Sequence, residues 1–165
     1  MPASPDGPGP DTQALFREAF TKTPLHALLG LRFVEPEPTD GTVVIEMDVA
    51  PPSFNGSGNL HGGAIATLVD VAAGSCAGRV SGFDPLTQSL VTADLHVRYL
   101  GRPKAGPVRA EARPMRAGRM LVVIEVRVLD ALDNVIAYAD FSAMVVAHRE
   151  PLAGAVPTDP RTPDL

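Results

Sequence analysis

The sequence predicts an α+β fold in which one long helix packs against one curved antiparallel sheet. Two observations indicate this fold. Residues 60–80 are apolar on almost every side, as is typical of a helix buried within a protein. From residue 89 onward, apolar and polar residues alternate in segments joined by short turns, which favours an antiparallel sheet. One helix layer against one sheet layer defines the α+β class.

The elements are expected in the order short helix, two strands, long helix and four strands. An amphipathic helix is expected over residues 11–21, ended by Pro24, and a helical turn is expected at Leu25–Leu29. The long buried helix follows at Leu60–Val80, after a loop rich in glycine, serine and asparagine. The predicted strands are Leu31–Val34, Thr42–Val49, Leu90–Tyr99, Val108–Pro114, Met120–Leu129 and Val135–Ala147.

The strand Leu90–Tyr99 shows the clearest alternation in the sequence. Its odd-numbered positions, beginning with Val91, are apolar, and its even-numbered positions, beginning with Thr92, are polar. Because successive side chains of a strand point to opposite faces, this pattern places Val91 on the core face and Thr92 on the other face.

Composition limits the domain organisation and the classes of partner. The 165 residues, 45% of them apolar, suit a single domain with a substantial core. We expect this domain to span residues 11–148, between disordered tails at 1–10 and 149–165 that each contain four prolines. The net charge of −5 argues against nucleic acid as a partner.

The same composition indicates a reduced, cytoplasmic protein. The single cysteine, Cys76, excludes an internal disulfide and a cysteine-based zinc site, and its apolar helix indicates a core position. No apolar run approaches the roughly 20 residues of a membrane helix, and the N-terminus lacks the features of a secretory signal. The histidines lack metal-ligand spacing, and no nucleotide-binding motif is present, so no metal or cofactor is expected.

Asp70 is the most informative residue, because it is a carboxylate within the most apolar segment of the chain. Burying a carboxylate costs several kcal/mol unless it is paired or protonated. Asp70 therefore lies at the wet edge of the helix, pairs with an arginine, or lines a cleft as a base or nucleophile. The small neighbours Ala66, Thr67 and Gly74 favour the cleft. Gly74 and Gly78 each cost the helix about 1 kcal/mol, which fits either a close ligand or close helix packing.

The start of the long helix is a second candidate site. His61, Gly62 and Gly63 lie where backbone N–H groups are free and the helix dipole is positive, so a ligand oxygen can be polarised there. A glycine pair is also a common entry turn. Gly62 and Asp70 are separated by about 12 Å of helix, too far to act on one carbon. Two antiparallel copies of the helix across a dimer axis bring them together.

Two further features surround these candidates. Asn55 and Asn59 lie in the preceding loop; Asn59 suits a helix cap, and the Asn55 amide can reach a carbonyl or a water. Residues 98–119 hold seven of the 14 Lys and Arg residues and a single acid, Glu111. This excess of positive charge fits either an anionic ligand or a solvated sheet face.

The segment NGSGNLHGGAIATLVDVAAG resembles the hotdog-fold acyl-CoA thioesterases of the phenylacetate-pathway (PaaI-like) type. VTADLHVRYLGRP is similar to a later strand of that family, and the resemblance covers about residues 25–147. It implies a hotdog fold, in which a long central helix is wrapped by a curved antiparallel sheet of five to six strands. It also implies a dimer that often pairs into a tetramer, with active sites at the subunit interface. The substrate is then an acyl-CoA, with neither metal nor organic cofactor.

The resemblance also implies roles for individual residues. The Gly62 N–H and Asn55 polarise the thioester carbonyl, and Asp70 from the partner subunit activates water or attacks directly. His61 holds the thioester end, and Thr92 positions the water if the strand twists or bulges to bring it inward. The expected contacts of the coenzyme A portion are Gly63, Arg116 and Arg119.

The expected reaction is hydrolysis of an acyl-CoA thioester to a free acid and coenzyme A. A hotdog hydratase is one alternative, but it needs a histidine and an acid in a different loop arrangement. A non-catalytic acyl-CoA-binding protein is the other, and it usually carries a DNA-binding domain, for which residues 1–24 are too short. The acyl group and the choice between dimer and tetramer stay open.

Overall fold

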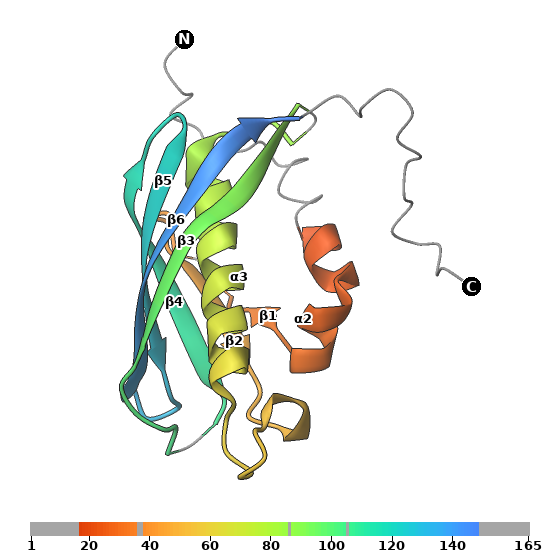
Figure 1. The fold of residues 1–165 in the computed structure, drawn as a ribbon, viewed down its shortest axis with the longest axis vertical. Helices are drawn as coiled ribbons and strands as arrows, with labels where there is room; N and C mark the ends of the chain where they lie inside the picture. Colours follow the sequence, from red (N-terminus) through yellow and green to blue (C-terminus); the bar gives the residue numbers. More distant parts are fainter. Residues whose placement is uncertain (1–16, 36–37, 86, 105, 149–165) are drawn as a thin grey trace, which may run out of the picture.

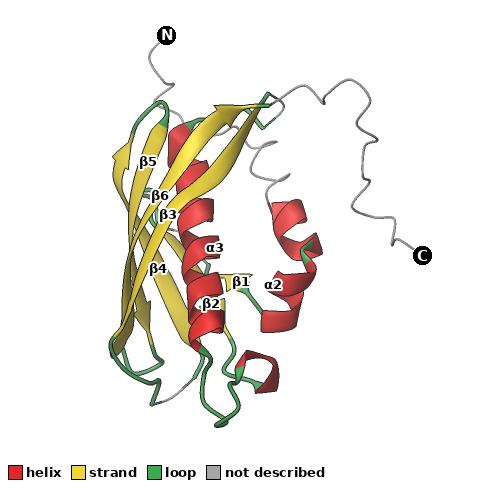
Figure 2. Cartoon of the chain, in the orientation of Figure 1, coloured by secondary structure: helices red, strands yellow, loops and turns green. Residues whose placement is uncertain are grey.

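The computed structural model describes residues 17–35, 38–85, 87–104 and 106–148. These residues form one six-stranded antiparallel sheet with a long helix packed on one of its faces (Figures 1 and 2). The predicted α+β arrangement is therefore confirmed. The predicted tails at 1–10 and 149–165, and residues 11–16 of the first predicted helix, lie outside the described residues.

The elements follow the predicted order, with boundaries shifted by a few residues. Residues 17–22 are helical. They are followed by α2 (Pro24–Leu29), β1 (Arg32–Phe33), β2 (Val43–Met47), the short 3-10 turn η1 (Pro51–Ser53), α3 (Gly62–Ser81), β3 (Gln88–Tyr99), β4 (Val108–Ala117), β5 (Leu121–Leu129) and β6 (Val135–Ala147). The strand order is β1-β2-β4-β5-β6-β3, so β3 forms one edge of the sheet.

The long helix α3 is apolar because most of its surface packs in the core. Leu68, Val69 and Cys76 are fully buried between α3 and the sheet. The expected core position of Cys76 is therefore confirmed, and burial raises the pKa of its thiol to about 12. Twenty residues long with a mean hydropathy of 1.2, α3 does have the length and composition of a membrane-spanning helix. Our exclusion of such a helix by length was therefore wrong; burial of half of that stretch within the protein accounts for its apolar character.

The helix begins at a different cap from the one expected. His61 is the N-cap, in extended conformation, and its Nδ1 accepts a hydrogen bond from the Gly63 N–H at 2.8 Å. Asn59, the expected cap, lies two residues too early and donates its amide to the Ser57 carbonyl at 3.2 Å. At the other end, α3 stops at Gly82, whose positive φ of 61° favours glycine.

The N-terminal helical residues cover the side of α3 that faces away from the sheet (Figure 1). The helical stretch 17–22 ends before Pro24, as expected, and Pro24 begins α2. Phe20 is buried, and its ring contacts Phe33 and His26 at centroid distances of 4.5 and 4.6 Å. This segment therefore forms a second wall opposite α3.

Candidate active site

A bulge in β3 decides which side chains of that strand face α3. The register of β3 against β6 shifts between Thr92 and Asp94. Before the shift, Leu90 packs against the core; after it, Leu95 and Val97 do so. The alternation is thus reversed at the bulge, and the expected core position of Val91 is wrong, because Val91 is 48% exposed.

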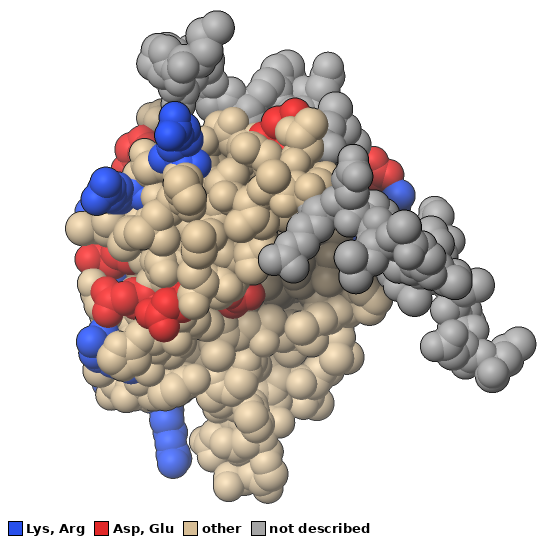
Figure 3. All heavy atoms as spheres, turned by 45° about the horizontal axis from the view of Figure 1, so that its top comes forward, with Lys and Arg blue, Asp and Glu red and all other residues tan. Residues whose placement is uncertain are grey.

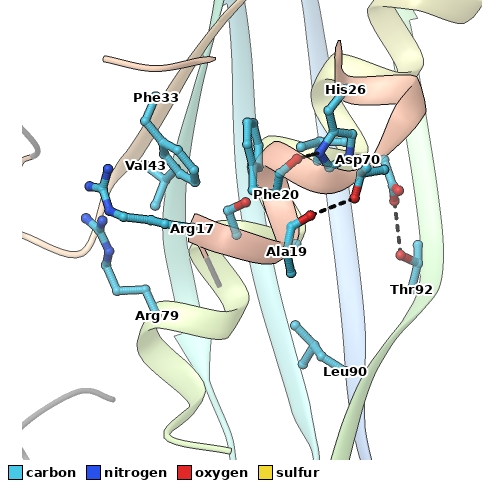
Figure 4. A pocket seen from close by; sticks show the side chains of 14 residues that line it. Arg17, Ala19, Phe20, His26, Phe33, Val43, Asp70, Arg79, Leu90 and Thr92 are labelled. Carbon is cyan, nitrogen blue, oxygen red and sulfur yellow. Dashed lines mark hydrogen bonds between the residues drawn. The ribbon is translucent and has the colours of Figure 1, made fainter. Parts of the chain in front are cut away.

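The same bulge brings Thr92 to the face that carries Leu90. Thr92 Oγ1 donates a hydrogen bond to Asp70 Oδ1 at 3.0 Å (Figure 4). Strict alternation pointed Thr92 away from this site, and the extra residue in the strand turns it inward. Two of the predicted site residues, 22 positions apart in sequence, are therefore in direct contact.

Asp70 lines a pocket of about 360 Å³ between α3, β3 and the N-terminal helices. It is half-buried beside the edge strand β3, so it lies both at an edge of the helix and in a cleft. A Cβ on Gly74, one turn later, would meet no atom within 4 Å, which leaves that wall low. Apolar side chains form most of the remaining wall: Phe20, Phe33, Val43, Val71 and Leu90.

The start of α3 provides a backbone donor, as expected, but from one glycine only. The Gly63 N–H is occupied by its bond to His61, whereas no acceptor for the Gly62 N–H is found within the described residues. Tyr99 Oη donates to the Gly62 carbonyl at 3.1 Å and holds that peptide in place. Gly62 therefore presents the free N–H at the positive end of the helix dipole.

Asn55 lies in the loop before α3, which is closed by a bridge between Phe54 and Leu60. Its Oδ1 accepts the backbone N–H groups of Ser57 and Asn59 at 2.9 and 3.1 Å. This fixes the side chain and leaves its amide nitrogen without a partner in the described part of the chain. A second donor is thus held near the start of α3.

One chain does not bring all of the predicted site residues together. Gly62 and Asp70 lie on the same continuous helix, eight residues or about 12 Å apart. Arg116 and Arg119 are exposed in the β4–β5 hairpin, at the end of the molecule opposite the start of α3 (Figure 1).

Sequence reasoning missed Arg17, His26 and Arg79, which also line the Asp70 pocket. Arg79 was detectable as the second charged residue of the apolar segment.

Comparison with known proteins defines the class. The model of the thioesterase superfamily matches residues 57–149, more than half of the chain. The chain therefore belongs to the thioesterase superfamily. A Bacillus subtilis protein named "Putative esterase ComA2" is 30% identical over 118 residues, covering 72% of this chain and 90% of that protein. A Halobacterium salinarum protein with the same esterase description is 39% identical over 79 residues, covering 48% of this chain and only 51% of its own length.

Solved structures confirm the hotdog fold. A mutant thioesterase of Pseudomonas aeruginosa superposes with a TM-score of 0.74 at 23% identity, covering 86% of this chain and 97% of the other. The PaaI protein of the E. coli phenylacetic acid degradation operon superposes with a TM-score of 0.68 at 18% identity, covering 81% and 92%. At these identities the likeness extends to the fold alone, so closer kinship to PaaI stays a prediction.

Proposed function

We propose that this protein hydrolyses an acyl-CoA thioester to a free carboxylic acid and coenzyme A. The observation that carries the proposal is Asp70, held by Thr92 at the edge of a largely apolar pocket. Membership of the thioesterase superfamily supports the class of reaction. The cytoplasmic location stays a prediction, as does the exclusion of nucleic acid and membranes as partners.

The start of α3 polarises the thioester carbonyl in this proposal. The Gly62 N–H and the Asn55 amide donate to the carbonyl oxygen, where negative charge develops in the transition state. His61 keeps the first turn in shape through its bond from Gly63, and its exposed ring borders the thioester end. Gly63 supports this turn, and its contact with coenzyme A stays a prediction.

Asp70 supplies the base or the nucleophile. As a base, it takes a proton from water while the water oxygen bonds to the thioester carbon. The C–S bond then breaks, and the thiolate of coenzyme A takes up the proton. As a nucleophile, the Asp70 carboxylate attacks the thioester carbon, the C–S bond breaks, and coenzyme A leaves as its thiolate. Water then cleaves the resulting anhydride to the free acid and restores the Asp70 carboxylate, and the proton released from water goes to the thiolate. In both routes the Thr92 hydroxyl orients the carboxylate.

The proposal requires a homodimer, because Gly62 and Asp70 of one chain are about 12 Å apart. Within the described residues, the 12-residue edge strand β3 pairs on one side only, and its other side is suited to pairing with a second copy. In the view of Figure 3, charged side chains gather mainly along one margin, and the centre is largely uncharged. Two copies in antiparallel contact place Gly62 of one subunit near Asp70 of the other, in a dimer or a dimer of dimers.

A thiol-release assay across a panel of short, medium and aromatic acyl-CoAs tests the activity. We expect release of free coenzyme A from at least one class, at a rate that depends on the acyl group. Binding of acyl-CoA without thiol release from any member would contradict the proposal and favour a binding protein. Hydration of an enoyl-CoA without thiol release would favour the hydratase.

The hydrogen bond from Thr92 gives a prediction for kcat. Thr92→Val keeps the shape of the side chain and removes the hydroxyl that orients Asp70. We expect kcat to fall about tenfold, since a hydrogen bond to a charged group is worth about 1.5–3 kcal/mol. Thr92→Ser is the matched control, and it should retain most of the activity. Equal kcat for Thr92→Val and the wild type would show that Thr92 has no part in catalysis.

The exposed arginines of the β4–β5 hairpin give a prediction for KM. Changing Arg116 and Arg119 to alanine should raise KM for a full acyl-CoA about two- to fivefold and leave kcat nearly unchanged, as for exposed charge contacts. The increase should vanish for a short acyl thioester that lacks the nucleotide, and should shrink at high salt. Arg127→Ala, an exposed arginine on β5, serves as control. Equal KM changes on both substrates would instead indicate a structural role.

A further inference from the structure

Neither the backbone nor the packing of the described residues requires a glycine at position 74. Gly74 lies inside α3, where glycine destabilises a helix relative to alanine, and its φ is not positive. A Cβ on Gly74 would meet no atom within 4 Å, whereas a Cβ on Gly63 or Gly118 would come within 2.9 or 2.7 Å of another atom. The space beside Gly74 is therefore open, and an alanine side chain would fit there without strain.

This open space belongs to the pocket that Asp70 lines. Gly74 follows Asp70 by four residues, so the two residues share one face of α3 and lie about 6 Å apart along the helix axis. An acyl group whose thioester carbon is at Asp70 can therefore extend across Gly74. The alternative is that a second chain packs closely on α3 at Gly74, and it predicts the opposite effect of an added side chain on stability.

Each of the three layers that enclose the pocket contributes an apolar side chain to its wall. Val71 belongs to α3, Leu90 to β3 and Phe20 to the N-terminal helical residues. Such walls bind an apolar group by removing its surface from water, and every additional methylene that becomes buried strengthens the binding. The pocket is thus suited to an acyl group that is longer than a few carbons.

Several polar side chains of the pocket are engaged by other groups of the chain. Figure 4 shows Arg17 and Arg79 extending away from Asp70. Arg17 pairs with a carboxylate at 2.7 Å, and Arg79 donates to a backbone carbonyl at 3.2 Å. The Thr23 hydroxyl and His26 Nδ1 also donate to backbone carbonyls, at 2.9 and 3.1 Å. The part of the pocket next to Asp70 therefore favours an uncharged acyl group.

We propose that Gly74 determines the acyl-group specificity of this protein. The acyl group is uncharged and apolar, and it extends from Asp70 across Gly74 into the pocket. Glycine at this position makes room for the acyl group and lowers the stability of α3 in exchange. This inference rests on the proposed thioester hydrolysis and adds the class of acyl group.

Two substrates that differ only in chain length test the role of Gly74. For the wild type, we expect kcat/KM to be at least about tenfold higher for octanoyl-CoA than for propionyl-CoA, because the additional methylenes are buried. Gly74→Leu places a side chain in the open space. It should lower the octanoyl-to-propionyl ratio at least about tenfold and change kcat/KM for propionyl-CoA less than about twofold.

Gly101→Leu is the matched control for this change. Gly101 is exposed in the loop after β3, and a Cβ there would also meet no atom within 4 Å. The control should keep the wild-type ratio. Because the ratio compares two substrates of one preparation, partial loss of folded protein does not change it.

Three outcomes of these assays would overturn the proposal. A wild-type ratio of one or less would show that the pocket does not favour a longer apolar group. An unchanged ratio in Gly74→Leu would show that the acyl group does not lie across Gly74. Equal losses on both substrates in that variant would show that Gly74 supports the geometry of Asp70 instead.

Gly74→Ala separates an open pocket from a packing contact between two chains. We expect the thermal midpoint of unfolding to rise by about 2–4 °C, since alanine is the better helix former and meets no neighbour at this position. A lower midpoint, or loss of the dimer in light scattering, would show that a second chain packs against Gly74, and the proposal would be wrong.

Failure of this inference differs from failure of the proposed function. Hydrolysis of both substrates with an unchanged ratio in Gly74→Leu rejects the role of Gly74 and leaves the thioesterase function intact. Absence of hydrolysis for every acyl-CoA in the panel rejects the function and, with it, the acyl group inferred here.

Discussion

Asp70→Asn is expected to fold and to lower the turnover of the best acyl-CoA substrate about a hundredfold or more. Asparagine keeps the size of the side chain and can still contact Thr92, but it can neither take a proton from water nor attack the thioester. The measurement is kcat by thiol release, together with the thermal midpoint of unfolding. An unchanged thermal midpoint together with a strongly reduced kcat would indicate that Asp70 has a chemical role and not a structural one.

Asp94→Asn is the matched control for this change. Asp94 is an exposed carboxylate on the other side of the same β3 bulge. The control should retain wild-type turnover. Near wild-type turnover of the Asp70 variant would reject Asp70 as base or nucleophile. A higher thermal midpoint of unfolding for the Asp70 variant would show that the native carboxylate destabilises the folded protein.

Heterodimers of two inactive chains are expected to regain about half of the wild-type activity. One chain carries Asp70→Asn and the other Asn55→Ala, so each homodimer lacks one part of both sites. If Gly62 and Asn55 of one subunit work with Asp70 of its partner, one site of the heterodimer contains only wild-type groups. The other site then carries both changes.

This recovery depends on the length of α3. About 12 Å of continuous helix separates Gly62 from Asp70, so a composite site needs two chains. Co-expressed chains with different affinity tags allow the heterodimer to be isolated and assayed. Sites built within one chain would leave one defect in each and give no recovery. A monomer by light scattering would also contradict the composite site.

The amino-acid sequence determined the elements whose signals are local. The all-round apolar character of residues 60–80 predicted α3, and the short turns between alternating segments predicted the antiparallel sheet. Asp70 stood out because a carboxylate within an apolar helix is costly, and Cys76 was assigned to the core because it lies within that helix with no adjacent histidine. Each of these inferences used only residues that are close together in the sequence.

Only the tertiary structure decided which side chains meet across elements. The bulge in β3 reverses the strand pattern and turns Thr92 toward Asp70, and no local signal marks where an extra residue enters a strand. The N-terminal helices bring Arg17 to the same pocket as Arg79, from opposite parts of the chain. The N-cap of α3 is His61 and not the predicted Asn59, because the path of the preceding loop sets which side chain reaches the free N–H groups. Alternation and amphipathicity report which face of an element is buried, whereas the register and packing of distant segments decide what lies opposite that face.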